Sequence, residues 1–273
     1  MNFFDITNRL IEHMNEVKDN NIIYIALQGS QNYGLDIEGS DIDTKTFAVP
    51  TLHDIVLNKK PVSYTHVMEN EEHCDVKDIR LMFDCFRKQN INFLEVLFTD
   101  YYITSVLYEK EINKLRSLRE EIAHYNNYAA VNCMAGMAME KFKALEHPYP
   151  TIKWKIYKWG YDGKQLHHIL RMENFMDAFL DGAPFSYCLT SFHIYDKETL
   201  IAAKKNSFEL LDARKMAKES MEHIDQMKED YMKKMPLIIN EEVKEEMDNI
   251  VYDIIVKSIK EEFEKKENPS LVD

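Results

Sequence analysis

The chain has 273 residues, of which 45% are hydrophobic and 30% are charged, a composition typical of globular domains. Its net charge of −13 repels nucleic acid at long range, which argues against strong duplex DNA binding but permits a nucleotide or short RNA end in a locally basic site. The sequence predicts no secretory signal or membrane span, and its four cysteines show no metal-binding spacing. We therefore expect a cytoplasmic protein with reduced thiols and no membrane partner.

The first part of the chain mixes helical and strand patterns. Residues 4–18 repeat apolar positions at helical spacing, and residues 22–30 form an Ile-rich run that stops at Gly-Ser, typical of a buried strand entering a turn. Further strands are predicted at 43–49 and 72–77, and a helix at 79–89. Together these elements predict a mixed β-sheet with helices.

The second part is helical, with breaks at PYPT and at Pro236. Helices are predicted at 109–123, 126–146, 162–181, 205–233 and 240–266, and residues 261–273 are predicted to be a frayed, solvated end. We therefore predict an α+β fold, with an α/β domain over residues 1–108 and a helical domain over residues 109–273.

Two carboxylates stand where the second strand is predicted to begin. Asp41 and Asp43 flank Ile42, and because side chains alternate along a strand, both carboxylates would face one side while Ile42 points into the core. Phosphoryl transfer needs divalent cations held by carboxylates on rigid backbone. The pair therefore predicts a Mg²⁺ or Mn²⁺ site.

A second device precedes the pair. The predicted strand at 22–30 ends in Gly29 and Ser30, which would present backbone N–H groups and a hydroxyl to the phosphates of a nucleoside triphosphate. Gly29 also permits a close backbone approach.

These residues carry a family resemblance. The order of apolar strand, Gly-Ser, ten intervening residues and Asp-x-Asp resembles the DNA polymerase beta-like nucleotidyltransferase superfamily. GSQNYGLDIEGSDIDTKTFAVP is similar to a branch of predicted bacterial and phage nucleotidyltransferases that also carries D-x-K-x-x-x-H-x-x-R. The chain matches that second motif with Asp162, Lys164, His168 and Arg171. The resemblance implies a polymerase beta-like fold, a nucleotidyltransferase-type mixed sheet followed by a helical domain, with the nucleotide in a cleft between them.

The resemblance also implies roles for the acidic residues. Asp41 and Asp43 would bind two Mg²⁺ ions, and a third carboxylate on a following strand would help to hold one metal and deprotonate the attacking hydroxyl. Asp75, which has an apolar residue on each side, is the best match, with Glu72 and Asp78 as alternatives.

The chain also departs from the branch. Thr44 stands where an apolar residue is usual, and Lys45-Thr46 stands where Arg-Gly is frequent.

On a helix, Lys164, His168 and Arg171 would form one stripe, which is either a phosphate-binding set or an exposed basic face. Residues 151–171 form a basic and aromatic segment with five Lys or Arg residues, one acidic residue and both tryptophans. We expect the two tryptophans to pack in the core. Tyr33 either packs against the nucleotide or fills its loop.

We therefore predict an enzyme that moves a nucleotidyl group from a nucleoside triphosphate to an acceptor hydroxyl, with release of pyrophosphate. ATP is the expected donor on cellular abundance. The acceptor is an RNA 3′ end, a protein side chain or a small molecule. The alternative is a nucleotide-binding regulator or toxin-neutralising partner that keeps the fold without turnover, against which the intact Asp41 and Asp43 argue.

Overall fold

The computed structural model describes residues 3–267. Of the frayed end predicted at 261–273, residues 261–267 continue the last helix, and residues 268–273 lie outside the described residues. Contacts within the chain group it into two compact units. We call the first the sheet unit (residues 3–32, 39–125 and 240–267 of the described chain) and the second the helical unit (33–38 and 126–239).

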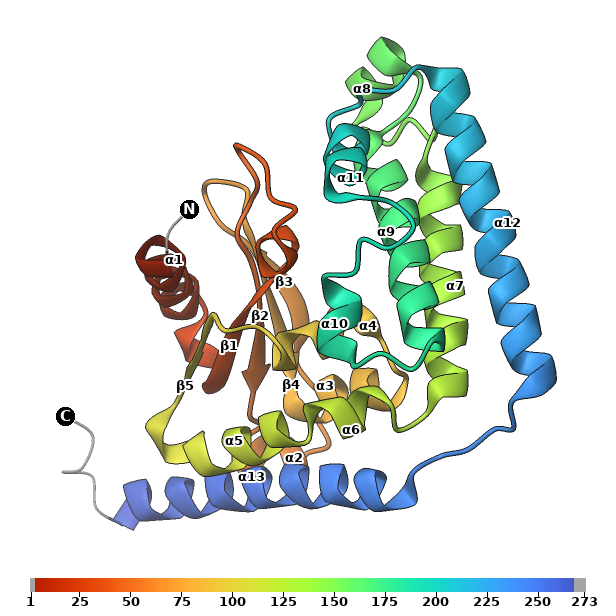
Figure 1. Cartoon of the computed structure of the whole chain (residues 1–273). Coiled ribbons are helices and arrows are strands. Elements are labelled where there is room, and N and C mark those ends of the chain that lie inside the picture. Colours follow the sequence, from red (N-terminus) through yellow and green to blue (C-terminus); the bar gives the residue numbers. More distant parts are fainter. Residues whose placement is uncertain (1–2, 268–273) are drawn as a thin grey trace. The chain divides into compact units, whose positions relative to one another are not determined.

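The sheet unit is built on a five-stranded mixed sheet with strand order β3-β4-β2-β1-β5 (Figure 1). β2 and β4 run parallel, whereas the other neighbouring pairs run antiparallel. The strands are β1 (Ile22–Gln28), β2 (Asp43–Ala48), β3 (Ser63–Val67), β4 (His73–Asp78) and β5 (Tyr102–Thr104). The predicted α+β fold is thus confirmed.

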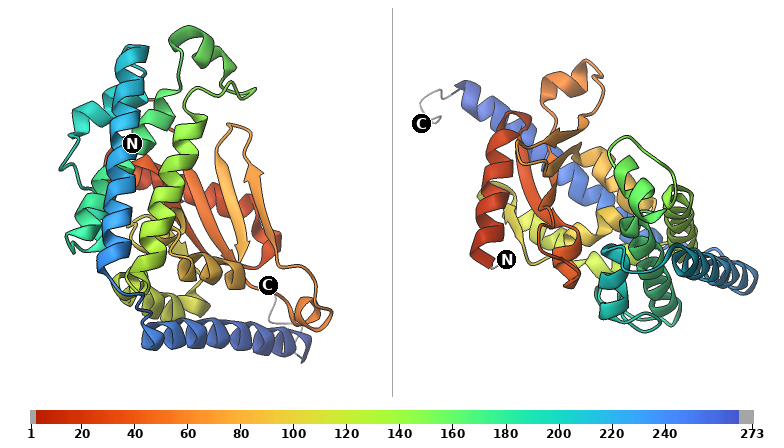
Figure 2. Two further views of the ribbon diagram at one scale, coloured as in Figure 1. Left: turned by 90° about the vertical axis from the view of Figure 1, so that its right-hand side faces the viewer. Right: turned by 90° about the horizontal axis from the view of Figure 1, so that it is seen from above.

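Side chains of β1 alternate between two covered faces, as a period of two requires. Ile25 and Leu27 belong to apolar clusters that include Val17 and Leu10, at the face covered by helix α1 (Phe3–Glu16; Figure 2, right). Tyr24 points to the opposite face, where its hydroxyl donates to the carbonyl of Val96 at 2.7 Å. The sheet therefore has a core on both sides, which fixes its register.

A buried polar network crosses the α1 face and explains why a threonine follows the acidic pair. His13 contacts the hydroxyl of Thr44 through Nδ1 at 2.9 Å and the carboxylate of Glu72 through Nε2 at 3.0 Å. Arg9 also donates to Glu72. Burial raises the pKa of Glu72, but the hydrogen bonds from Arg9 and His13 outweigh it and hold that pKa below its usual value.

We expect Thr44→Val to lower the free energy of unfolding by about 1–3 kcal/mol, because it leaves a ring nitrogen of buried His13 without its partner. Urea denaturation at pH 7 measures the change. Thr151→Val, at an exposed position, is the control and is expected to stay within about 0.5 kcal/mol of the wild type. Equal stability of the two variants would contradict the importance of this network.

Ten further helical segments surround the sheet, of which α13 is the longest. Its carboxylate Asp248 pairs with Arg87, and its Lys257 donates to Glu111 at 3.0 Å. The segments are η1 (Lys18–Asn20), α2 (Leu52–Val56), α3 (Ile79–Arg87), α4 (Ile91–Leu94), η3 (Glu95–Leu97), η4 (Val106–Tyr108), α5 (Glu109–Ser117), α6 (Arg119–Ala123) and α13 (Glu241–Glu267), together with η2 (Ser30–Tyr33), whose last residue groups with the helical unit. Because α5, α6 and α13 pack with the sheet unit, the division differs from the one expected at 108/109.

The helical unit is organised around α9, which packs against its other long helices (Figure 2, left). A Cβ at Gly163 would lie 2.2 Å from the carbonyl oxygen of Ala203, so a glycine is needed where α9 approaches α11. Asp162 caps α9 by accepting from the backbone N–H of Lys164 at 3.2 Å. The helices are α7 (Asn127–Ala144), α8 (Lys153–Trp159), α9 (Gly163–Leu180), α10 (Phe185–Leu189), α11 (Lys197–Lys204) and α12 (Leu210–Lys234).

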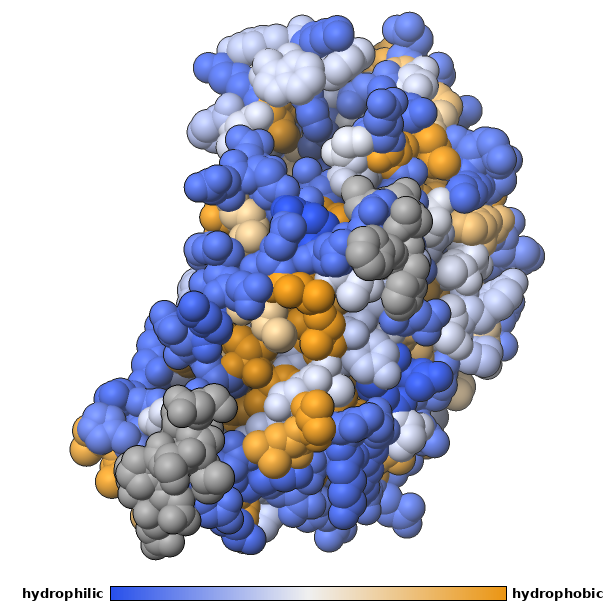
Figure 3. Space-filling view, turned by 90° about the vertical axis from the view of Figure 1, so that its left-hand side faces the viewer, coloured by the Kyte–Doolittle hydropathy of each residue, from blue (hydrophilic) through white to orange (hydrophobic). Residues whose placement is uncertain are grey.

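The surface drawn in Figure 3 is mostly hydrophilic, with smaller hydrophobic areas between the polar ones, in keeping with the high content of charged residues. Within residues 3–267, none of the helices combines the length and the apolar character that crossing a membrane requires. The four cysteines are free.

Candidate active site

The acidic pair lies at the start of β2. Ile42 is fully buried in a cluster with Leu10 and Leu27, on the α1 face, as the alternation of side chains predicts. Asp43 pairs in register with Gln28, the last residue of β1. Its Oδ1 accepts from the backbone N–H of His73 at 3.0 Å, while Asp41 is exposed. The acidic pair therefore lies where β1 ends and β2 begins.

Asp75 lies on the neighbouring strand and is held by a buried lysine. Lys45, only 3% exposed, is in register with Asp75, and their Nζ and Oδ2 atoms are 2.7 Å apart. The ammonium also lies 4.1 Å from the ring centre of Phe93. Burial raises the pKa of Asp75, but the charge and hydrogen bond of Lys45 outweigh it and hold that pKa below its usual value. Alternation along β2 puts Asp43 and Lys45 on one face of the sheet.

The two alternative third carboxylates have other partners. Glu72 belongs to the network with Arg9 and also accepts from the backbone N–H of Ile42 at 3.3 Å. Asp78 caps α3 and pairs with Arg80 at 2.6 Å. Of the three acids, Asp75 is therefore the one that lies beside β2 on the same face of the sheet as Lys45.

The Gly-Ser turn depends on a residue that sequence reasoning missed. Gly29 has φ +108°, a conformation that other residues rarely adopt, and its N–H donates to Oε1 of Glu95 at 3.1 Å. Glu95 is only 2% exposed. The Gly29 N–H that was expected to bind phosphate is therefore engaged within the protein, because a buried carboxylate 66 positions along the chain needs a donor. Ser30 follows at the start of η2.

The acidic pair offers oxygen ligands to a divalent cation. Mg²⁺ is commonly bound through one or two carboxylates together with substrate phosphates, and Asp41 with Asp43 can supply that donor set. The oxygens of Asp75 instead accept hydrogen bonds from Lys45 and Thr65. In the part of the chain that the structure describes, no three His, Cys, Asp or Glu side chains form a group able to hold a metal. The donor set thus fits a cation held by two carboxylates, and the expected third ligand is committed elsewhere.

The helical unit brings together the basic motif and Tyr33. The guanidinium carbon of Arg171 lies 3.7 Å from the ring centre of Tyr33, so the ring and the cation stack. Arg171 is only 6% exposed, yet its Nε and Nη2 have no hydrogen-bond acceptor among the described residues. Buried polar groups are nearly always paired. Two unpaired guanidinium donors in this position are suited to an anion.

Lys164 and His168 lie on the same helix at the expected spacing, with Lys164 exposed and His168 half-buried. Desolvation lowers the pKa of His168 well below its usual value, and the charges of nearby cations, Arg171 and Lys164 among them, add to the shift. His168 is therefore neutral at pH 7, and the positive charge of the stripe comes from Lys164 and Arg171.

His167 is a structural residue. It is buried, and its Nδ1–H donates to the carbonyl of Leu200 at 2.9 Å. Burial lowers its pKa to about 4. A group with a lowered basic pKa stays neutral in the folded state while the unfolded chain takes up a proton, so stability is lost as the pH falls from about 6.5 to about 4.

We expect the free energy of unfolding to decrease by roughly 3 kcal/mol over that range from His167 alone, at about 1.4 kcal/mol for each pH unit. Urea denaturation between pH 7 and pH 4 measures the slope. His167→Gln should flatten it. His193→Gln, at an exposed residue whose pKa Asp177 raises, should keep or steepen it. An unchanged slope in His167→Gln would contradict the assignment.

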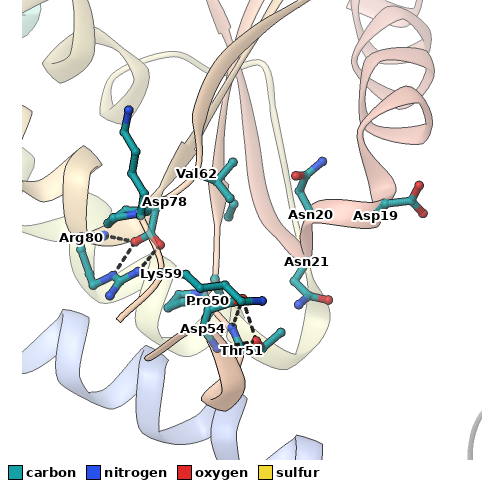
Figure 4. A pocket seen from close by; sticks show the side chains of 14 residues that line it. Asp19, Asn20, Asn21, Pro50, Thr51, Asp54, Lys59, Val62, Asp78 and Arg80 are labelled. Carbon is teal, nitrogen blue, oxygen red and sulfur yellow. Dashed lines mark hydrogen bonds and ion pairs between the residues drawn. The ribbon is translucent and has the colours of Figure 1, made fainter. Parts of the chain in front are cut away.

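A pocket also lies at the other end of β2, where Pro50 and Thr51 follow the strand (Figure 4). Four of its six charged lining residues pair with one another. Arg80 pairs with Asp78, and Asp54 accepts from Thr51 at 2.7 Å and pairs with Lys59 at 2.9 Å. Because these four charges are already paired and the remaining two, Asp19 and Lys60, are opposite in sign, we assign no ligand to this pocket.

A Gly-Ser turn followed by an acidic pair on a mixed sheet defines a nucleotidyltransferase-like protein of the polymerase beta type. The chain belongs to the RNA repair pathway DNA polymerase beta family, which it matches over residues 5–172. Among solved structures, it is similar to a nucleotidyltransferase-like protein from Exiguobacterium sibiricum 255-15, at 9% identity and a TM-score of 0.30, over 82% of this chain and 74% of that one. A comparison with curated proteins found no match.

Proposed function

We propose that this protein transfers a nucleotidyl group from a nucleoside triphosphate to an acceptor hydroxyl. The observation that carries the proposal is the acidic pair, Asp41 and Asp43, set on either side of buried Ile42 in a member of a polymerase beta family. Asp41 is exposed, and phosphoryl transfer requires carboxylates that stand close together to hold a cation.

In the proposed reaction the acceptor oxygen attacks the α-phosphorus, and the bond from that phosphorus to the bridging oxygen breaks as pyrophosphate leaves. A Mg²⁺ or Mn²⁺ ion bound by Asp41 and Asp43 would neutralise the charge that accumulates on the phosphate oxygens. The hydroxyl proton passes to a carboxylate, for which Asp75 is the candidate. Hydrogen bonds from Lys45 and Thr65 fix the position of this carboxylate and keep it ionised, as a proton acceptor must be.

Phosphate binding is assigned to the basic motif of the helical unit. The unpaired Nε–H and Nη2–H groups of Arg171 would donate to phosphate oxygens, and Lys164 would add charge. Neutral His168 would act as a hydrogen-bond partner. ATP is the donor we propose. The ring of Tyr33, whose centre is 3.7 Å from the guanidinium carbon, would hold Arg171 in place.

The test incubates the protein with Mg²⁺ or Mn²⁺ and each α-³²P-labelled nucleoside triphosphate, with total RNA, cell protein extract or neither. Label transferred by the wild type but not by Asp41→Asn is the expected result, and the labelled fraction identifies the acceptor class. Chelation of the metal by EDTA should stop the transfer. If no mixture is labelled while the protein still binds nucleotide, the alternative of a regulator without turnover replaces this proposal.

A further inference from the structure

One surface of the helical unit differs in chemistry from the rest of this acidic chain. Residues 147–161 contain three lysines and no Asp or Glu, although the whole chain carries a net charge of −13. Tyr149, Trp154 and Tyr157 are exposed by 47%, 57% and 77%. The expectation that the tryptophans pack in the core is therefore wrong for Trp154, because α8 turns that ring toward solvent.

Rings and cations alternate on this surface. The rings of Trp154 and Trp159 have centres 5.5 Å apart and are tilted by 56°. Lys158 Nζ lies 4.3 Å from the ring centre of Trp159, and Lys153 Nζ lies 5.5 Å from that of Tyr157. We call Tyr149, Lys153, Trp154, Tyr157 and Lys158 the aromatic–lysine surface.

The charge of this surface is available to a partner. Lys155 is committed to buried Asp162, whose Oδ1 it approaches at 3.3 Å. Within residues 3–267, neither Lys153 nor Lys158 forms an ion pair with a carboxylate. In a chain with 13 more acidic than basic residues, two lysines beside exposed rings and without a carboxylate partner among the described residues complement a polyanion that also has flat, apolar faces.

Single-stranded nucleic acid has both properties. Its bases stack on exposed aromatic rings, its phosphates pair with lysines, and every base offers a π-face. A duplex hides those faces within its own stack. A membrane surface fits less well, because α8 has only seven residues and carries rings and lysines interleaved rather than on opposite faces. Since the family is that of an RNA repair pathway, RNA is the strand we test first.

We infer that the aromatic–lysine surface binds single-stranded RNA and, on the proposed function, holds the acceptor strand. The inference deepens that function by naming its acceptor class. Binding itself needs neither metal nor nucleotide, so it can be measured separately from transfer.

The protein provides its own reporter, because Trp154 and Trp159 are its only tryptophans. A single-stranded RNA of about 12 nucleotides is titrated against the full chain without metal or nucleoside triphosphate, and tryptophan fluorescence is followed. Saturable quenching that weakens with salt is expected. Trp154→Ala should raise the Kd roughly tenfold, with Trp159 as the remaining reporter, whereas Trp154→Phe should retain most of the affinity.

The lysines are tested as a pair. Lys153→Ala with Lys158→Ala should reduce the slope of log affinity against log salt by about 1.4, at about 0.7 for each phosphate contact. Lys215→Ala with Lys218→Ala on α12 removes the same charge from another exposed surface and should leave affinity and slope unchanged. Thermal unfolding of each variant checks that it is folded.

Three outcomes would overturn the inference: no saturable RNA binding at low salt, equal losses in the control pair, or equal or tighter binding to duplex RNA, single-stranded DNA or phosphatidylserine vesicles. Asp41→Asn should bind RNA like the wild type, because Asp41 is not part of this surface. RNA binding without transfer would therefore count against the proposed function alone, and transfer to a small acceptor without RNA binding against this inference alone.

Discussion

Asp41→Asn is expected to lower the rate of nucleotidyl transfer on the order of 1,000-fold or more, while leaving the protein as stable as the wild type. The carboxylate is exposed, so replacing it should change stability little. Its loss removes one of two ligands for the cation that stabilises the phosphates, an interaction worth several kcal/mol. Removal of one of two neighbouring negative charges also relieves repulsion in the metal-free protein.

The measurement is the initial rate of label transfer at saturating metal, together with urea denaturation of both proteins. Asp41 is a cleaner site than Asp43 for this test, because Asp43 also accepts a hydrogen bond from the His73 backbone. Asp36→Asn, an exposed carboxylate in the same connection between β1 and β2, is the matched control and should transfer at the wild-type rate. Full activity of Asp41→Asn would remove the metal assignment.

Local patterns in the sequence predicted the core of the sheet unit. β1 lies within the apolar run at 22–30, and β2 lies within the run at 43–49 that Pro50 ends. The alternation of side chains alone predicted the burial of Ile42. Short-range information was sufficient here because the central strands are buried on both faces. The basic motif on α9 was also readable, since its spacing is that of a helix.

The edge strands of the sheet and the contacts between residues far apart in the sequence could not be predicted from local patterns. β3 carries exposed residues on both faces and β5 has only three residues, so neither shows an apolar alternation. Glu95 reads as an ordinary helix residue, and its bond to the Gly29 N–H depends on a chain reversal that no local pattern encodes. The same applies to α13, whose helical pattern does not say that it packs with the sheet unit.

The Lys45–Asp75 pair gives a physical reason for one departure from the family pattern, the Lys45 that stands where arginine is frequent. A lysine nearly excluded from water is costly unless a carboxylate pairs with it, and register places Asp75 directly beside it. The charge of Lys45 therefore holds the pKa of Asp75 below its usual value, and the ion pair fixes the position of the Asp75 carboxylate. On the proposed mechanism, that position is what a proton acceptor for the incoming hydroxyl requires.

Arg171→Met is expected to weaken nucleoside triphosphate binding by roughly 1.5–3 kcal/mol, about 10- to 100-fold in Kd, without lowering the stability of the protein. A buried cation whose Nε and Nη2 lack acceptors among the described residues contributes little to folding, and an apolar side chain of similar length fits the same space against Tyr33. Affinity and stability should therefore change independently. A structural arginine would lose both together.

Equilibrium binding of ATP, by calorimetry or filter retention, and urea denaturation supply the two readouts. Arg214→Met is the matched control, because Arg214 is exposed and already paired with Glu146, and it should leave ATP affinity unchanged. Arg171→Lys keeps the charge but loses the planar fork of donors, so its Kd should fall between those of the wild type and Arg171→Met. Unchanged ATP affinity in Arg171→Met would leave the two unpaired donors without a ligand and return Lys164, His168 and Arg171 to the alternative of a basic face with no role in nucleotide binding.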